Sequence, residues 1–378
     1  YLSSPSQSDE LDVFGAWTRF RNGEFRQIKS NSLSFADPSE TLWTIIPVEV
    51  NEDGQSEWVV WLTGTSPLHM DMWLLDESIN VLEHYETGTL RPYSTRPQSE
   101  RSFGLPIGLE VKGKFYVVFK LTLPDEAQLQ FYTGPTEQFL EYGALDAIYW
   151  SVYVGLAAMM TFYSLFLFWV TRRREFLIYA FYVVSIVIAA LTSSELIHRY
   201  VWPELGAMGF RIVTAFGFFS GAIASLFIAE LLELRLKNRA LWNAFRACIV
   251  AALILCVLAL NIDIHKSLAL SIYWGGGLTL FLVSVGLVSA AKGSTIGKLL
   301  SCGWAAQLLG LGGLLAHNGG WMPDVLWLDF SFLIGSSVEM LFFSLAIPLA
   351  IEAFDIKTPP ILIGFNLATG VIAPVLPT

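Results

Sequence analysis

The sequence predicts a membrane protein with an N-terminal antiparallel β-sandwich followed by a bundle of seven transmembrane helices. Of its 378 residues 54% are apolar and only 15% charged, against about 25% charged in an average soluble domain. The first 140 residues hold 20 of the 33 acidic and 10 of the 23 basic residues, so they carry the whole net charge of −10. The remainder is neutral, and the chain therefore joins an acidic water-soluble domain to a membrane domain.

The first 140 residues show the pattern of short strands. Residues 43–50, 58–62 and 115–119 are rich in β-branched and aromatic side chains, and residues 69–73 and 127–131 alternate polar with apolar side chains. Such segments, separated by turns every 8–12 residues, are typical of antiparallel sandwiches. We therefore expect residues 1–140 to form a β-sandwich, residues 141–357 the membrane domain and residues 358–378 a hydrophobic tail of unknown role.

Seven apolar stretches have the length of about 20 residues that a membrane-spanning helix needs. They cover residues 146–171, 176–197, 208–232, 241–262, 267–291, 297–317 and 328–352. Nine basic residues follow the first, third, fifth and seventh stretches: Arg172, Arg173, Arg174, Arg235, Lys237, Arg239, Lys292, Lys298 and Lys357. The other connectors hold only Arg199 and Lys266. By the positive-inside rule the sandwich lies outside and the C-terminus in the cytoplasm, with Trp202, Trp321 and Trp327 at the outer boundary.

Two sets of motifs resemble one family. The first set comprises Met72-Trp73-Leu74-Leu75-Asp76, Tyr85-Glu86-Thr87-Gly88, Pro92 and Arg96-Pro97. The second comprises Tyr163-Ser164-Leu165-Phe166-Leu167-Phe168, Arg174-Glu175-Phe176-Leu177-Ile178-Tyr179, Arg199-Tyr200-Val201-Trp202-Pro203, and Gly335 with Glu339. In their order and spacing, over residues 30–355, they resemble the bacterial seven-transmembrane receptors with diverse intracellular signalling modules.

The resemblance implies a receptor of the bacterial inner membrane with a type-2 periplasmic sensor domain, a jelly-roll similar to carbohydrate-binding modules. The family usually continues into a coiled coil and an output domain, such as a diguanylate cyclase or a histidine kinase. Here Ser164 stands where the family has Asn, and Pro359-Pro360 would break a continuing helix before the sequence stops at Thr378. We therefore expect the cytoplasmic effector to be separate or missing.

Four residues of the sandwich are candidates for a ligand-binding face: Arg96, Trp61, Trp73 and Tyr85. Aromatic rings stack on sugar faces, and an arginine fork can hold a carboxylate or hydroxyl groups, so the predicted ligand is a glycan or another small molecule. The alternative is that the aromatic side chains point inward and form the core of the sandwich.

Glu339 lies near the middle of the seventh apolar stretch, where a charged carboxylate costs at least about 2.5 kcal/mol. Such a residue faces the interior of a bundle, and Gln307, Tyr179 and Tyr182 are its expected neighbours. It is predicted to act either as a switch that transmits the signal or as a static polar contact between helices.

His198, Arg211 and His317 are the other candidates for signal transmission, together with Glu195, Asp263, His265, Asp324 and Asp329 at the outer helix ends. This group is expected to form a docking surface for the sandwich or a mouth for a small ligand, or to be ordinary solvated loop residues. His198 and His317 would titrate near neutral pH and respond to external pH. On the cytoplasmic side the basic residues 172–174, Arg235, Lys237 and Arg239 are expected to contact the effector.

The leading functional hypothesis is a signalling receptor whose outer domain senses a ligand and whose helices transmit the change inward. The alternatives are an anchoring subunit of a larger membrane complex and a transporter, although the sequence lacks the inverted repeat typical of transporters. The expected partners are the lipid bilayer, an external ligand and a cytoplasmic effector or membrane complex, and no nucleic acid. No catalytic or metal-ligand constellation is present, so neither an enzyme nor a cofactor is expected.

Overall fold

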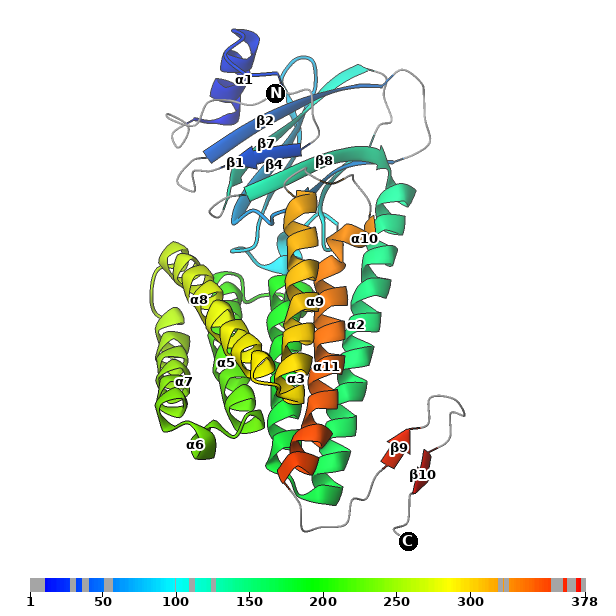
Figure 1. The fold of residues 1–378 in the computed structure, drawn as a ribbon. Helices are drawn as coiled ribbons and strands as arrows, with labels where there is room; N and C mark the ends of the chain where they lie inside the picture. The colour runs from blue at the N-terminus through cyan, green and yellow to red at the C-terminus, as the bar shows by residue number, and fades with distance from the viewer. Residues whose placement is uncertain are drawn as a thin grey trace.

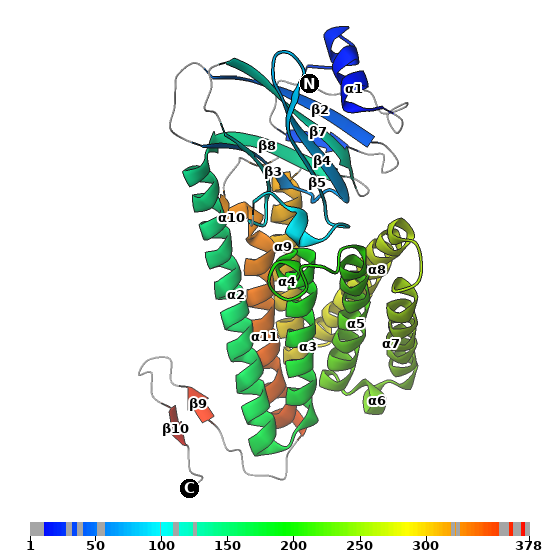
Figure 2. The ribbon, with the colours of Figure 1, turned by 180° about the vertical axis from the view of Figure 1, so that it is seen from behind.

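The computed structural model describes most of the chain. The described residues are 11–27, 32–35, 41–50, 57–98, 100–108, 113–123, 127–318, 322, 326–354, 363–365 and 372–374. A β domain lies at one end of a helical bundle, as both views of the ribbon show (Figures 1 and 2). We call the end of the bundle beside the β domain the docking end and the opposite end the distal end.

The β domain is a sandwich of two antiparallel sheets. Among the described residues eight strands form one sheet of order β1-β8-β3-β6 and another of order β2-β7-β4-β5. The strands are β1 Ser32–Phe35, β2 Thr41–Val50, β3 Trp58–Gly64, β4 His69–Leu75, β5 Val81–Thr87, β6 Phe103–Ile107, β7 Gly113–Thr122 and β8 Ala127–Pro135. Their inward side chains, among them Val60, Met72, Leu105, Phe119 and Leu129, form one buried core. The predicted sandwich is confirmed.

Helix α1 (Val13–Arg21) was not predicted from the sequence. The side chain of Asp12 caps it by accepting a hydrogen bond from the backbone N–H of Gly15 (2.7 Å). The helix packs Trp17 and its neighbours on the outer face of the β2-β7-β4-β5 sheet, against Trp43 and Val118. Nine residues are too few for a helix to be stable alone, so its existence depends on this tertiary contact.

Seven long helices form the bundle: α2 Thr136–Thr171, α3 Arg174–Ser193, α5 Ala207–Leu231, α7 Arg239–Ala259, α8 Ile264–Ala291, α9 Thr295–Asn318 and α11 Ser331–Phe354. All seven are long and apolar enough to cross a membrane, which confirms the predicted spans. Two predicted spans are shorter than expected, because α4 (Leu196–Tyr200) and α10 (Leu326–Asp329) are separate helices. Glu195 separates α3 from α4 with a left-handed backbone (φ 64°).

The bundle has two parts. Helices α2, α3, α9 and α11 stand together below the β domain, while α5, α7 and α8 lie to one side of them (Figures 1 and 2). The closest approach joins α9 to α11, where a Cβ on Gly310 would lie 2.4 Å from the carbonyl oxygen of Ser331. A Cβ on Gly335 would lie 2.6 Å from the carbonyl oxygen of Ala306. Small residues at such crossings let the two backbones approach closely.

At the distal end lie the short helix α6 (Leu234–Lys237) and the connector between α2 and α3. Beyond α11, strands β9 (Ile363–Phe365) and β10 (Ile372–Pro374) pair antiparallel. The rest of the predicted tail lies outside the described residues. The same holds for five residues named in the sequence analysis: Trp321, Asp324, Lys357, Pro359 and Pro360.

Candidate functional site at the junction of the β domain and the bundle

The β domain continues into the bundle without a linker. Strand β8 ends at Pro135 and helix α2 begins at Thr136, whose backbone N–H and hydroxyl both donate to the carbonyl of Glu57 (2.9 Å each). Phe139, in the first turn of α2, is fully buried against Trp61 and Val59 of β3. At 1.5 Å per residue the 36 residues of α2 span about 54 Å, whereas a hydrocarbon core is about 30 Å thick. One rigid helix therefore belongs to both parts of the molecule.

A second connection is made by residues 89–101, which we call the docking segment. It contains the 3₁₀ helix η2 (Tyr93–Thr95) and contacts the docking end of the bundle around α4. The backbone N–H of Tyr93 donates to the carbonyl of Pro203 (2.6 Å), in the connector between α4 and α5. A Cβ on Gly206 would lie only 2.8 Å from the carbonyl oxygen of Leu90. The backbones of the two parts are thus in direct contact.

The centre of the docking segment is a buried ion pair. The guanidinium of Arg96 contacts the carboxylate of Glu195, and their side chains are only 3% and 6% exposed. Arg96 is also held between the rings of Tyr93 (4.2 Å) and Phe103 (3.9 Å). The hydroxyl of Thr89 donates a further hydrogen bond to Glu195 (3.0 Å). Burial lowers the pKa of Arg96 to about 10, which leaves it protonated at neutral pH.

Two further ion pairs flank this one. Arg199 of α4 donates to Glu100 at 3.1 and 3.3 Å. Arg101 donates to both carboxylate oxygens of Asp146 on α2, at 2.9 and 2.7 Å. Burial opposes the charge of Arg101, but Asp146 outweighs that effect and the pKa of Arg101 is raised. The docking segment contributes a cation, an anion and a cation in turn, with Arg96, Glu100 and Arg101.

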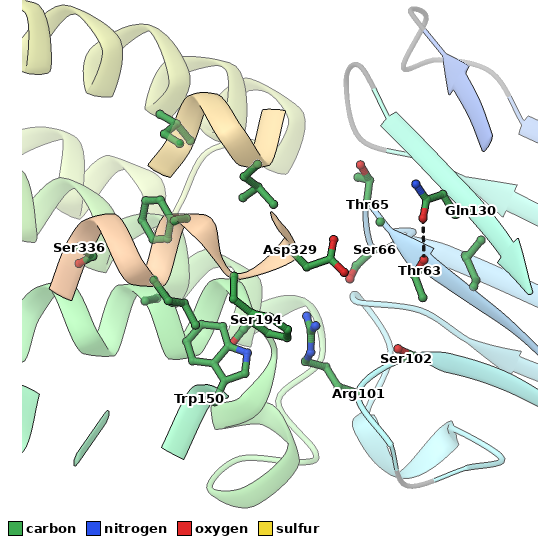
Figure 3. A pocket seen from close by; sticks show the side chains of 18 of the residues that line it. Thr63, Thr65, Ser66, Arg101, Ser102, Gln130, Trp150, Ser194, Asp329 and Ser336 are labelled. Carbon is green, nitrogen blue, oxygen red and sulfur yellow. Dashed lines mark hydrogen bonds between the residues drawn. The ribbon is translucent and has the colours of Figure 1, made fainter. Parts of the chain in front are cut away.

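A cavity of about 510 Å³ lies between the β domain and the bundle. The loop after β3, with Thr65 and Ser66, closes it on one side, and Trp150, Ser194 and Ser336 of the bundle line the other (Figure 3). Arg101 and Asp329 lie between these two sides (Figure 3). The cavity therefore reaches from the sandwich into the helices, beside the ion pairs of the docking segment.

The inner end of the cavity is one turn from a polar cluster inside the bundle. Ser336 of α11 shares a hydrogen bond with the hydroxyl of Tyr153 on α2 (3.1 Å). Three residues further along α11, Glu339 accepts a hydrogen bond from Tyr182 of α3 (2.9 Å), one of its expected neighbours. Tyr179 instead donates to the carbonyl of Met340 (2.5 Å). Helices α2, α3 and α11 are thus joined by hydrogen bonds next to the cavity.

The structure does not bring the four predicted ligand-binding residues together. The guanidinium of Arg96 is buried in its ion pair with Glu195. Trp61, in the β1-β8-β3-β6 sheet, packs on Phe139. Trp73, in the β2-β7-β4-β5 sheet, stacks on Trp43 and on His84 at the outer face of that sheet. Tyr85 pairs with Met72, one residue from Trp73, and contacts the interior core. Successive side chains of a strand point to opposite faces, so no shared ligand face is formed.

The residues predicted at the outer helix ends make contacts in different parts of the bundle. Arg211 donates to the carbonyl of Leu260 (2.8 Å) and so joins α5 to α7, and His317 pairs with Asp329 (2.9 Å). His198 is buried against Gly209, where an added Cβ would lie 2.0 Å from its Nε2. Burial and the charge of Arg96 lower the pKa of His198. This shift moves its titration away from neutral pH, contrary to the predicted response there.

The basic residues predicted to contact an effector all lie at the distal end. Arg174 pairs with Glu230 (2.9 Å) and Lys237 with Glu233 (3.5 Å). The other four are Arg172, Arg173, Arg235 and Arg239. Of these, Arg235 and Arg239 line an open pocket with Arg246, Trp242 and Asn243.

The sequence reasoning missed the two flanking ion pairs and the cavity. Asp146 gave a weak signal, as an acidic residue at the start of the first apolar stretch. Glu100 and Arg101 gave none, because their partners are 99 and 45 residues away. Among the described residues, no group of three His, Cys, Asp or Glu side chains is placed to hold a metal ion.

A sandwich joined directly to seven helices that are long and apolar enough to cross a membrane indicates a multi-pass membrane protein with a receptor-like architecture. Comparison with protein families agrees with this class. The model described as 7TM diverse intracellular signalling matches residues 146–348, and that described as 7TMR-DISM extracellular 2 matches residues 1–134. The chain therefore belongs to the family of seven-transmembrane receptors with diverse intracellular signalling modules. No curated protein matches the chain.

Proposed function

We propose that the chain is a signalling receptor of the bacterial inner membrane that transmits changes in its outer β domain to the distal, cytoplasmic end of the bundle. The observation that carries this proposal is the junction, where a shared helix and three ion pairs join the two parts. A flexible linker would absorb a displacement of the β domain, whereas this junction transfers it to α2, α3 and α4.

The polar cluster next to the cavity offers a path for such a displacement. Moving α2 against α11 would change the hydrogen bond between Tyr153 and Ser336, and moving α3 would change the one between Tyr182 and Glu339. A receptor of this kind needs two arrangements of the bundle and an input that favours one of them. The predicted glycan is not part of this proposal, because the four residues chosen for it do not share a face.

The distal end supplies the surface that an effector would read. Eight of the nine basic residues expected in the cytoplasm are described, and they lie on the connectors α2–α3, α5–α7 and α8–α9 or in the first turn of the helix that follows. This bias supports a cytoplasmic distal end. The exposed Arg235 and Arg239 favour a partner with an acidic surface.

The test uses the full chain in lipid nanodiscs and amide hydrogen exchange at the distal end. Glu100→Arg would place two cations against each other, and the swap Glu100→Arg with Arg199→Glu would restore the pair. We expect the single variant to change exchange in residues 171–176 and 232–240 by at least about fivefold, the lower range of allosteric coupling. The swap should return exchange toward the native level.

The control is Arg19→Glu, which changes a charge on α1 whose neighbour Glu24 belongs to the β domain alone. It should leave exchange at the distal end unchanged. If Glu100→Arg loosens residues 89–101 but exchange at the distal end stays native, the junction is only a static attachment and the receptor proposal fails. That outcome would favour an anchoring subunit.

A further inference from the structure

The cavity at the junction has the size of a small-molecule site. Cavities that bind small ligands in proteins measure about 300–1,000 Å³, and this one has a volume of about 510 Å³. It is built from both parts of the chain, with the loop after β3 on one side and α2, α3, α9 and α11 on the other (Figure 3). A ligand held there would contact the sandwich and the helices at once.

The lining changes along the cavity. At the β domain it consists of hydroxyl and amide groups: Thr63, Thr65, Ser66, Ser102 and Gln130. Between the helices it is apolar, with Ile186, Ala190, Leu311, Leu314, Phe332 and Leu333. At the inner end it becomes polar again, at Ser336 and Gln307. This order matches a molecule with an apolar body and a polar group at each end.

Two polar atoms on the helical side of the cavity point to a ligand. The indole N–H of Trp150 and the side-chain oxygen of Gln307 are buried without a hydrogen-bond partner among the described residues. Buried polar groups in proteins are nearly always hydrogen-bonded, and both of these residues line the cavity. One is a donor and the other an acceptor, and hydroxyl or primary amide groups are able to satisfy each of them.

The charged groups of the lining already have partners. Arg101 makes two hydrogen bonds with Asp146, and Asp329 pairs with His317. A charged ligand would have to break one of these pairs or be buried without a partner, which is costly. The lining therefore favours a neutral molecule over a fatty-acid anion.

We infer that this cavity binds an uncharged, single-chain amphiphile with a hydrogen-bonding group at each end of an apolar chain. One polar end lies against the β domain, and the other lies between the helices, where Trp150 offers a donor and Gln307 an acceptor. Because Ser336 at the inner end is bonded to Tyr153, occupancy acts on the polar cluster of the bundle. The inference deepens the proposed receptor function and, as a signalling input, rests on it.

The test measures binding directly on the full chain in nanodiscs. The probe is a ten-carbon α,ω-diol, compared with the ten-carbon mono-alcohol and the ten-carbon hydroxy acid. The readout is the indole N–H resonance of Trp150 in protein with nitrogen-15-labelled tryptophan, assigned through Trp150→Phe. A hydrogen bond to the diol should shift this resonance saturably, with the mono-alcohol about threefold to tenfold weaker because it lacks one hydrogen bond.

Three variants make the test specific. Ala190→Phe fills the cavity and should abolish the shift, whereas Ala305→Phe places the same ring on an exposed face of α9 and should leave it native. Gln307→Leu should weaken the diol about threefold to tenfold and remove its advantage over the mono-alcohol. Partitioning of the probes into lipid is the same for all these variants and cannot imitate the pattern.

Equal binding of diol and mono-alcohol, strongest binding by the hydroxy acid, no saturable shift, or a shift that persists in Ala190→Phe would each overturn the inference. The proposed function fails separately. If the diol binds but neither it nor Glu100→Arg changes exchange at the distal end, the site stands and the receptor proposal falls. If Glu100→Arg changes that exchange but the diol does not bind, the receptor proposal stands and this inference falls.

Discussion

At the docking end of the bundle, charged side chains from the β domain and from the helices are paired, and the Arg96–Glu195 pair is buried. At the distal end most of the described basic side chains are exposed, and the ion pairs Arg174–Glu230 and Lys237–Glu233 lie within the bundle itself. Matched and buried charges fix one partner, because separating them leaves a charge without compensation. Exposed charges of one sign remain available to another molecule. The docking end is therefore committed to an internal contact, whereas the distal end keeps the exposed charges that the proposed effector would contact.

The largest expected effect comes from breaking the buried pair. Arg96→Met leaves Glu195 buried without its cation and should lower the free energy of unfolding by about 3–5 kcal/mol, measured by chemical denaturation in bicelles. Adding Glu195→Gln should recover most of the loss. Arg19→Met is the control, since Arg19 of α1 pairs with Glu24 at a partly exposed site within the β domain and should cost about 1 kcal/mol or less. Equal losses of unfolding free energy for the two methionine variants would show that the buried pair contributes no more to stability than a partly exposed pair.

Backbone contact at the docking end gives the next effect. Gly206 has a left-handed backbone (φ 47°), and a Cβ there would lie 2.8 Å from the carbonyl oxygen of Leu90. Gly206→Ala should therefore cost about 1–3 kcal/mol and increase hydrogen exchange in the docking segment. Gly217→Ala on α5 has no atom within 4 Å of the added Cβ and should be neutral or stabilising by up to about 1 kcal/mol. If Gly206→Ala and Gly217→Ala give the same hydrogen exchange in the docking segment, the backbones of the β domain and the bundle are not in contact.

A smaller effect is expected inside the membrane, where Glu339 is bonded to the neutral hydroxyl of Tyr182 rather than to a cation. A double-mutant cycle with Glu339→Leu and Tyr182→Phe should give a coupling energy near 0.6 kcal/mol, and at most about 1.7, from unfolding in bicelles. Glu339→Gln keeps an acceptor and should leave the fold intact. If Glu339→Gln abolishes the effect of Glu100→Arg on distal-end exchange, Glu339 is a switch; native exchange would make it a static contact.

The smallest effect is a pH dependence of the docking end. Burial and the charge of Arg96 lower the pKa of His198 from 6.5, so the folded state binds the proton less readily than the unfolded state. Above about pH 6.5 the His198 ring is neutral and the free energy of unfolding has its full value. The free energy of unfolding falls as the pH drops through the lowered pKa. Unfolding measured between about pH 6.5 and 5 should show this loss in the native chain and less of it in His198→Gln. Equal pH dependence in both would exclude His198 as its source.

The parts of the fold that depend on local pattern could be predicted. Runs of β-branched and aromatic side chains predicted the strands at 43–50 and 115–119, and continuous hydropathy predicted all seven spans, because both signals arise within short stretches of the chain. The helix Val13–Arg21 was missed, since its stability comes from packing on Trp43 and Val118. The break at Glu195 was missed as well, because the left-handed conformation of one residue leaves no mark on the hydropathy of its neighbours.

The candidate site was less accessible to sequence reasoning. Tyr182 could be proposed as a partner of Glu339, because a buried carboxylate restricts the choice to a few polar residues in neighbouring helices. Arg96 was assigned to a ligand, although its partner is Glu195, 99 residues away. No periodicity links two such positions, and an arginine that can hold a ligand carboxylate holds a glutamate of its own chain equally well.

By itself the sequence determined that an acidic β domain is joined to seven apolar helices and that the basic residues gather at one end of them. These properties follow from the composition of each segment or from periodic patterns along it. Both depend on whether the segment is surrounded by water or by lipid. The tertiary structure alone decided which charges meet and which aromatic rings are buried. It also decided that a cavity lies between the two parts, lined by a donor and an acceptor that have no partner among the described residues. Burial and pairing depend on the atoms that surround a side chain, and those atoms come from segments far apart in the sequence.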